Sequence, residues 1–506
     1  MVNKKQKYGE ILWYFTVFAF FFVWFSRIHP LIVYDGDDWT YIAYVRRATP
    51  IWGEWNPSKV FPEVIMPFVS SVILHTLVPL LKDYITAFTV GHALVVSAFI
   101  TLYTWCFSRL LKRIFSLPEL TCALISALFL VFHFLVLRTN DAGNLYLFFC
   151  EDLNCYYNYL IPALLNACIV MHMIENPAFD TFLQKGCTAK KGIFYVIVYL
   201  AIFSNMTVSG ILAAYAGSQL LLHLLRQWKT FRLKAYINEN IPHFAILIGW
   251  FVSAVYELSG GRAAAASRNT PLYRSVYAAF WHLKNVLLHC NPLFWATVFT
   301  IILLCLVFLF RTRGKDTNSQ VFLPGAVTIL VSGAAIAVYS VLLCAMVNPY
   351  CMNRSEYLLP MFFYGFLIVL LALAYVVKQY PGVMTVLPLL VLFLTSDINT
   401  NGKTFEDSLM SDFAPSVCAD ISRDILNQFL AADEAGLTEM TLYVPLHVAN
   451  PEEEDNWPHS FFLMPRISRA LYEQGIISRE IGLKLVADPA YNERFHLPIP
   501  EIPSEN

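Results

Sequence analysis

The sequence predicts a mainly α-helical protein: a polytopic transmembrane bundle of about eleven crossings, followed by a small C-terminal α/β domain outside the membrane. Hydrophobic residues make up 57% of the 506-residue chain and charged residues only 14%, whereas a soluble domain carries about 25% charged residues. From Asp397 onward the chain carries nineteen acids against seven bases, and such a break in composition indicates a domain boundary. We therefore expect a transmembrane domain over residues 1–396 and a second domain over residues 397–506.

The N-terminal segment begins with Lys4, Lys5 and Lys7 and becomes apolar from Ile11. This order is typical of a signal peptide, but the apolar run is longer than a cleaved one and no small-residue cleavage pattern follows. The segment therefore predicts a retained first helix that starts on the cytoplasmic side of a plasma (inner) membrane.

Twelve apolar runs are candidates for a membrane crossing, which requires about 20 mainly apolar residues, although the runs from Gly192 and Thr207 are short. They begin near Ile11, Phe61, Tyr84, Leu117, Tyr156, Gly192, Thr207, Ile241, Pro292, Val321, Tyr357 and Val383. The clusters of Lys and Arg lie at residues 109–113, 185–191, 226–234 and 311–315, with a weaker signal at Lys378. If all twelve runs crossed, every cluster would lie outside, against the tendency of basic loops to face the cytoplasm.

A single non-crossing run before Arg109 reverses this outcome and places every basic cluster inside. The best candidate is Phe61 to Leu81, because it contains Pro62, Pro67 and Pro79, and proline disfavours a continuous helix interior. We therefore expect eleven crossings, a cytoplasmic N-terminus, an extracytoplasmic C-terminal domain and an outer loop over residues 34–81.

The segment after Asp397 has the pattern of a small α/β unit. Apolar residues at helical spacing predict a helix over 417–430, which Ala435 and Gly436 end. The runs 441–445 and 482–487 predict strands, with a helix over 467–472 between them. We expect this unit to rest on the membrane part, because about 110 residues with so few apolar runs make a thin core.

Three carboxylates, Asp35, Asp37 and Asp38, follow the first helix in the segment Tyr34-Asp-Gly-Asp-Asp-Trp39. Carboxylates are costly in hydrocarbon, so a cluster at the mouth of a bundle indicates a functional site. Asp37 and Asp38 are candidates for the general base that removes a proton from an acceptor hydroxyl, and the three acids together are candidates for binding a metal ion. The alternative is that Asp37 or Asp38 caps a helix over residues 39–47, although one cap needs only one acid.

Basic residues on the outer loops are candidates for binding a phosphate. Arg262 and Arg268 follow two glycines, which allow close approach of the backbone, and arginine binds phosphate in a bidentate manner. The alternative for this loop is a flexible segment with solvated arginines. Arg354 precedes a helix and fits a phosphate site, an ion pair with an acid of the first loop, or a contact with lipid headgroups. Lys59 is a further candidate.

Other acids and one aromatic residue complete the candidate substrate site. Glu151 and Asp152 precede the aromatic stretch 156–159, and they are candidates for contact with a sugar or a metal ion. The alternative is a belt of aromatic residues at the membrane interface. The candidate substrate-binding residues are Asp35, Trp39, Glu63, Glu151 and Asp152, with charge pairing as the alternative role of Glu63 and Lys59.

This arrangement resembles the GT-C superfamily of integral-membrane glycosyltransferases, which use polyprenyl-phosphate-linked sugars. In that family an acidic motif follows the first helix in the first outer loop, and surface helices precede the second crossing. Asp37-Asp38 matches the motif and Phe61 to Leu81 matches the second surface helix. The likeness is closest to uncharacterised bacterial members with a DD-aromatic motif and a C-terminal outer domain, and it extends to about Ser396. One departure is Lys59, where an arginine is expected after the stretch 52–57.

The resemblance implies a glycosyltransferase that moves a sugar from a polyprenyl-phosphate donor to an extracytoplasmic glycan, lipid or cell-wall polysaccharide of the cell envelope. Asp37 or Asp38 would be the base, and Arg262, Arg268 and Arg354 would bind the phosphate as its charge develops. Many members that use such donors need no metal, so no cofactor is assigned, and a divalent metal ion at the three acids stays open.

Two other functions remain alternatives. A transporter or flippase of lipid-linked sugars would predict internal repeats and acids near the membrane midplane, but the chain has no clear repeat and its acids lie at the outer edge. A glycan polymerase or ligase would use arginine-rich outer loops, which this chain has, but the acidic first loop fits the GT-C pattern better. Nucleic-acid binding is not expected, because the bases lie in short loops and not on one basic face.

Overall fold

The computed structural model describes residues 4–43, 57–138, 145–176, 188–259, 271–312, 314, 316–400, 414–446, 457–458 and 463–499. Each of the twelve apolar runs forms a helix in this structure. These helices are α1 (Lys4–Val23), α3 (Met66–Leu81), α4 (Tyr84–Phe115), α5 (Glu119–Leu135), α7 (Ile161–Glu175), α9 (Thr188–Ile202), α10 (Met206–Gln227), α12 (Ile241–Leu258), α15 (Pro292–Thr312), α16 (Thr317–Val347), α17 (Ser355–Gln379) and α18 (Leu387–Thr400).

Shorter elements connect or extend the long helices. The α-helices among them are α2 (Gly36–Ala43), α6 (Leu153–Cys155), α11 (Leu233–Glu239) and α14 (Leu272–Leu288). The π-helical and 3₁₀ turns are η1 (Trp24–Ile28), η2 (Phe61–Ile65), η3 (Tyr156–Leu160), η4 (Trp228–Thr230), η5 (Pro349–Asn353) and η6 (Pro381–Thr385). Three π-helical turns, η1, η2 and η3, each join a longer helix near the acidic loop.

The predicted class, a polytopic helical membrane bundle, is confirmed. Within the described residues, nine helical segments are long and apolar enough to cross a membrane, and α5 and α18 are shorter apolar helices. Helix α9 has 15 residues. The exact number of crossings, eleven, stays a prediction.

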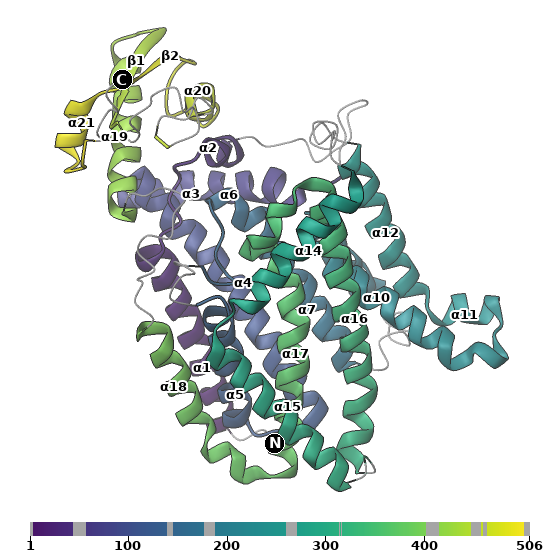
Figure 1. Ribbon diagram of the computed structural model, residues 1–506. Helices are drawn as coiled ribbons and strands as arrows, with labels where there is room; N and C mark the ends of the chain where they lie inside the picture. The colour runs from purple at the N-terminus through teal and green to yellow at the C-terminus, as the bar shows by residue number, and fades with distance from the viewer. Residues whose placement is uncertain are drawn as a thin grey trace.

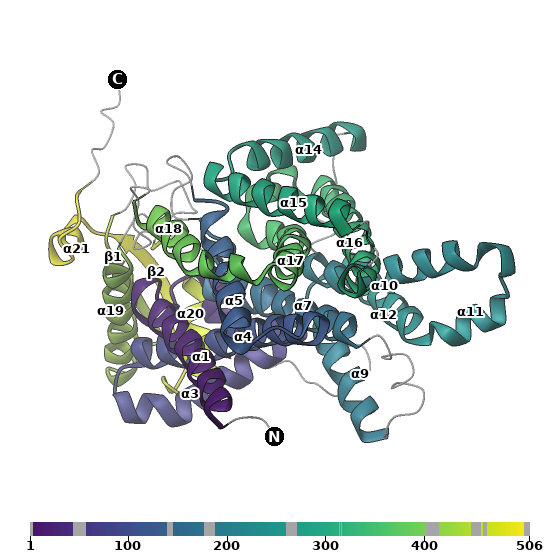
Figure 2. The ribbon, with the colours of Figure 1, turned by 90° about the horizontal axis from the view of Figure 1, so that it is seen from below.

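Burial separates the centre of the bundle from its edge. In the most apolar windows of the α6–α7 segment and of α17, 83% of the residues are buried, against 22% in α1 and α15. Helices α7 and α17 therefore lie inside, where α4 packs against α7 and α16 packs against α17. Seen from below, α1, α9 and α14 lie at the edge of the bundle (Figure 2). Their apolar outer faces suit contact with lipid.

The segment Phe61–Leu81, formed by η2 and α3, lies across the ends of the long helices (Figures 1 and 2). Helix α3 ends at Lys82, whose φ of 55° is left-handed. Asp83 then begins α4 by accepting a hydrogen bond from the Thr86 backbone N–H at 3.3 Å. This two-residue turn redirects the chain into the bundle. By length and composition, Phe61–Leu81 is one of the nine segments that could cross a membrane among the described residues, so its non-crossing role stays a prediction.

The C-terminal elements have the predicted order of helix, strand, helix and strand. They are α19 (Pro415–Glu434), β1 (Glu439–Val444), α20 (Leu463–Glu473), β2 (Gly482–Ala487) and α21 (Pro489–Arg494). The strands pair in parallel, from Glu439 opposite Gly482 to Val444 opposite Ala487, and α20 lies between them in the chain. Gly436 ends α19 with a φ of +69°, which glycine adopts without steric cost.

The C-terminal unit and the start of the chain lie at opposite ends of the bundle (Figure 1). Helix α18 continues to Thr400, so the change in composition at Asp397 falls inside the last helix of the bundle. Asp397 itself accepts a hydrogen bond from the Asn291 side chain at 2.9 Å. The four elements α19, β1, α20 and β2 sit over the end of the bundle that carries α2 and α3 (Figure 1).

Candidate functional site

The three acids after the first helix have three different environments. Helix α2 begins at Gly36, and Asp35 accepts a hydrogen bond from the Asp37 backbone N–H at 2.7 Å. Asp35 therefore occupies the capping position that a helix N-terminus favours. The expected helix over residues 39–47, capped by Asp37 or Asp38, is corrected by this arrangement: the helix starts three residues earlier and both of these acids lie in its first turn.

Asp38 is fully buried and ties two segments together. Its Oδ2 accepts hydrogen bonds from the backbone N–H groups of Tyr34 and Asp35, both at 3.3 Å. Its Oδ1 accepts from the backbone N–H of Asn154 at 2.8 Å. These three hydrogen bonds link the acidic loop to the segment that contains Asn154. The side chain of Asp38 has no exposed surface, so its carboxyl group is closed to solvent.

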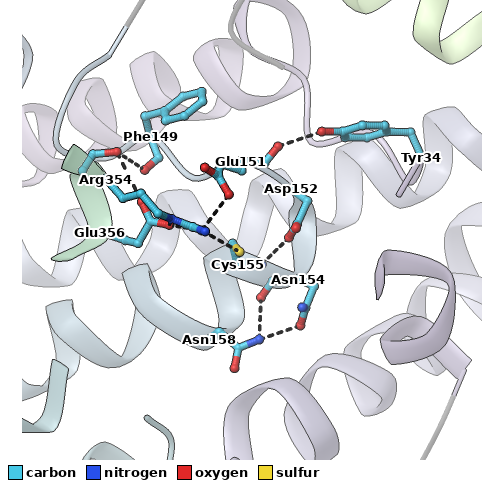
Figure 3. A network of polar contacts seen from close by, with 10 residues as sticks. Tyr34, Phe149, Glu151, Asp152, Asn154, Cys155, Asn158, Arg354 and Glu356 are labelled. Atoms are coloured by element: carbon cyan, nitrogen blue, oxygen red, sulfur yellow. Dashed lines mark hydrogen bonds and ion pairs between the residues drawn. The ribbon is translucent and has the colours of Figure 1, made fainter. Parts of the chain in front are cut away.

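The second segment is the turn that contains Glu151 and Asp152 (Figure 3). Asp152 caps α6 by accepting a hydrogen bond from the Cys155 backbone N–H at 2.6 Å. The Tyr34 hydroxyl donates to the carbonyl oxygen of Glu151 at 2.8 Å. The structure therefore brings together two acidic segments that lie more than a hundred residues apart in the chain.

Arg354 joins this turn to the start of α17 (Figure 3). Its Nη2 lies 2.7 Å from Oε2 of Glu151, and its Nε donates to Oε1 of Glu356 at 2.6 Å. Burial alone would lower the pKa of Arg354, but Glu356 and Glu151 raise it above its ordinary value, so the guanidinium stays charged. The expected ion pair with an acid of the first loop is corrected: the partners of Arg354 are Glu151 and Glu356.

Burial changes the titration of the acids in this cluster. It raises the pKa of Asp38 well above its usual range, with a further contribution from Asp152. Burial and the neighbouring Asp35 raise the pKa of Asp152 to about 7, and burial raises the pKa of Asp35 as well. Carboxyl groups this close resist ionising together, so the cluster holds protons near neutral pH.

The C-terminal unit supplies residues that the sequence pattern did not single out. Arg466 of α20 forms an ion pair with Asp37, and the Trp457 indole donates to the carbonyl oxygen of Tyr34 at 2.8 Å. Gln474 accepts from the Tyr84 hydroxyl at 2.6 Å and donates to the Ile42 carbonyl oxygen at 3.1 Å. No local motif marks these residues, because each acts through a contact with a segment hundreds of residues earlier.

Asp37 is a partly exposed acid of the loop. Its side chain is 35% exposed, whereas that of Asp38 is fully buried. The side chain of Arg466 is 33% exposed, so the ion pair lies at the surface, whereas Asp38 lies beneath it.

The remaining candidate residues lie in other places. Trp39 is 1% exposed and stacks on Tyr84 with ring centres 6.0 Å apart, so its ring packs the loop against α4. Lys59 lies 4.0 Å from Glu63, which agrees with the alternative of charge pairing. Arg262 and Arg268 fall outside the described residues.

Among the described residues, no group of three or more His, Cys, Asp or Glu side chains is placed to hold a metal ion. In comparisons with known proteins, no family model matches the chain, and neither a curated protein nor a solved structure matches it.

Proposed function

We propose that the chain is a membrane glycosyltransferase that moves a sugar from a polyprenyl-phosphate donor to an extracytoplasmic glycan, lipid or cell-wall acceptor. The observation that carries the proposal is the partly exposed carboxylate of Asp37, one residue before the fully buried Asp38. A general base needs both access to its substrate and a fixed position. Asp37 combines them, because α2 holds its backbone and Arg466 holds its side chain.

In the proposed reaction, the oxygen of an acceptor hydroxyl forms a bond to the anomeric carbon of the donor sugar. The bond between that carbon and the phosphate oxygen breaks, and its electron pair leaves with the polyprenyl phosphate. Asp37 takes the proton of the acceptor hydroxyl. Asp38 acts as a positioning residue, because its three hydrogen bonds fix the loop that carries Asp37.

Cationic side chains would stabilise the negative charge that develops on the leaving phosphate. Arg354 serves this role if the donor phosphate replaces Glu151 as its partner, since Glu356 remains as the second carboxylate. Arg262, Arg268 and Lys59 are the further candidates for the phosphate. Arg466 joins them, because it lies beside the base.

The proposal also includes a topology. The acidic loop, the start of α17 and the C-terminal unit would lie on the extracytoplasmic side, with the start of α1 in the cytoplasm. The orientation of α3 across the bundle supports this, because a non-crossing α3 places the basic clusters on the cytoplasmic side.

The experiment that tests the proposal measures sugar transfer by purified protein from a radiolabelled polyprenyl-phosphate hexose to an envelope-glycan acceptor. Asp37→Asn removes the basic carboxylate and keeps the size of the side chain, so transfer should fall on the order of 10²-fold or more. Asp420→Asn changes an acid of α19 that is 60% exposed and pairs with Arg423, and it should transfer like the wild type.

Two results would contradict the proposal. The first is full transfer by the Asp37→Asn protein. The second is movement of the labelled lipid across a vesicle membrane without formation of a glycosylated product, which would favour the flippase. Repeating the assay with a chelator separates a base from a metal ligand, since a base acts without added divalent metal.

A further inference from the structure

A cavity lies in the bundle, away from the acidic loop. It has a volume of about 330 Å³ and is bounded by α4, α7 and α9. It occupies the halves of α4 and α7 that are remote from Asp83 and Asp152, the residues that cap the other ends of these segments. Figure 2 shows α9 at the edge of the bundle, so the cavity lies where the bundle meets lipid.

The residues that line this cavity are sorted by polarity. The apolar members are Leu102, Trp105, Cys106, Leu165, Cys168, Ile169, Ile193, Phe194 and Ile197. The polar members are Arg109, His172, Glu175 and Lys190. The lining residues of each helix recur at helical spacing. The polar ones, Arg109 of α4, His172 and Glu175 of α7 and Lys190 of α9, lie at one end of the cavity.

The length of the apolar part follows from helix geometry. From Leu102 to Arg109 the chain rises about 10 Å, at about 1.5 Å per residue. From Leu165 to Glu175 it rises about 15 Å. The cavity is therefore an apolar groove that ends in charged groups, as an acyl chain ends in a headgroup.

The charged end carries a net positive charge. Glu175, which is 3% exposed, is bound by Arg109 at 2.6 Å and by His172 at 3.1 Å, so Arg109 balances its charge. Lys190 adds a positive charge on the side of α9. An anion fits this end better than a cation or a neutral group.

We infer that this cavity binds a membrane phospholipid with an anionic headgroup, whose phosphate lies at Lys190 and Arg109 and whose acyl chain lies along the apolar stripe. A soluble phosphate would leave the apolar walls empty, and a neutral lipid would leave the positive end unmatched. The inference does not depend on the proposed transferase activity, because none of these residues belongs to the acidic cluster.

The bound lipid would also attach α9 to the bundle. Helix α9 has 15 residues, which rise about 22 Å and fall short of the hydrocarbon thickness of about 30 Å. Ile193 is 62% exposed although it lines the cavity. A lipid in the groove would cover this side chain and add contacts that protein alone does not supply.

Native mass spectrometry of the delipidated full-length protein tests the inference, with phosphatidylglycerol as the anionic lipid and phosphatidylcholine as the zwitterionic one. Phosphatidylglycerol should bind more tightly, and glycerol phosphate without acyl chains should not compete. Lys190→Ala should weaken phosphatidylglycerol binding about fivefold, the effect expected of one basic residue near an anionic lipid. Lys229→Ala changes an exposed lysine of η4 that does not line the cavity, and it should have no effect.

A second pair of variants tests the apolar stripe. Ile193→Trp fills the groove and should reduce binding of the lipid at least as strongly as Lys190→Ala, whereas Val196→Trp adds the same bulk at a position of α9 that does not line the cavity. Equal binding of the two lipids, or unchanged binding by both Lys190→Ala and Ile193→Trp, would overturn the inference. Competition by glycerol phosphate would instead identify a site for a soluble anion.

Discussion

Replacement of Asp38 tests whether this acid holds the frame of the site. Asp38→Ala would leave three buried backbone N–H groups, those of Tyr34, Asp35 and Asn154, without their acceptor. Each such loss costs about 1–3 kcal/mol. Two of the three bonds are long, at 3.3 Å, so the low end of the range applies and the free energy of unfolding should fall by about 3 kcal/mol.

Asp38→Asn should be milder. The amide keeps one acceptor oxygen and carries no charge, and burial already raises the pKa of Asp38 so that the folded state favours the neutral form. The substitution loses the hydrogen bonds accepted by one of the two carboxyl oxygens, but it also removes a buried ionisable group, which offsets part of that loss. We therefore expect the free energy of unfolding to fall by about 1 kcal/mol at neutral pH.

The dependence of stability on pH follows from the same shift. An acid with a raised pKa in the folded state binds its proton more tightly there than in the unfolded chain. Its stabilising contribution is complete below the unfolded pKa of about 4 and is lost as pH rises through the folded pKa. The pKa values of Asp38, Asp152 and Asp35 are all raised, that of Asp152 to about 7. Stability should therefore decline between about pH 4 and pH 7, and less steeply in Asp38→Asn.

The assay is unfolding in mixed micelles with increasing SDS, followed by tryptophan fluorescence over this range of pH. Asp37→Asn is the control for stability, because an ion pair between half-exposed groups contributes at most about 1 kcal/mol. An Asp38→Ala protein that unfolds at the wild-type SDS concentration would refute the role of Asp38 as a structural link. An unchanged pH profile in Asp38→Asn would refute the assigned titration.

Three further predictions concern other parts of the molecule. Arg354→Lys should reduce sugar transfer at least tenfold with normal expression, because a lysine cannot reproduce contacts to Glu151 and Glu356 at once; wild-type kinetics would remove Arg354 from the site. Gly91→Val should destabilise the protein by about 1–3 kcal/mol in the SDS assay, because a Cβ at Gly91 would lie 2.4 Å from Ile73 of α3; an unchanged midpoint would contradict this contact. Single cysteines introduced in a cysteine-free background at residues 109–113 should be protected from an impermeant thiol reagent and cysteines in α19 should be labelled, and the reverse pattern would overturn the proposed orientation.

The sequence by itself determined the local elements of this protein. The apolar runs are long enough to specify helices wherever they occur, and the alternation and turn residues of the tail specify its two strands and two helices. Proline content and the charge of the loops also singled out Phe61–Leu81, which lies across the bundle (Figure 1). These signals are read from neighbouring residues, and neighbouring residues decide helix and strand formation.

The tertiary structure decided which side chains meet. The sequence could not distinguish the three acids of the first loop, because burial by the turn at residues 151–154 is what sets Asp38 apart from Asp37. It gave no sign of Arg466, whose partner lies 429 positions earlier in the chain. It singled out Arg354 as a candidate, but only packing assigned Glu151 and Glu356 as its partners. Such contacts depend on how distant elements pack, and no local pattern of residues records that packing.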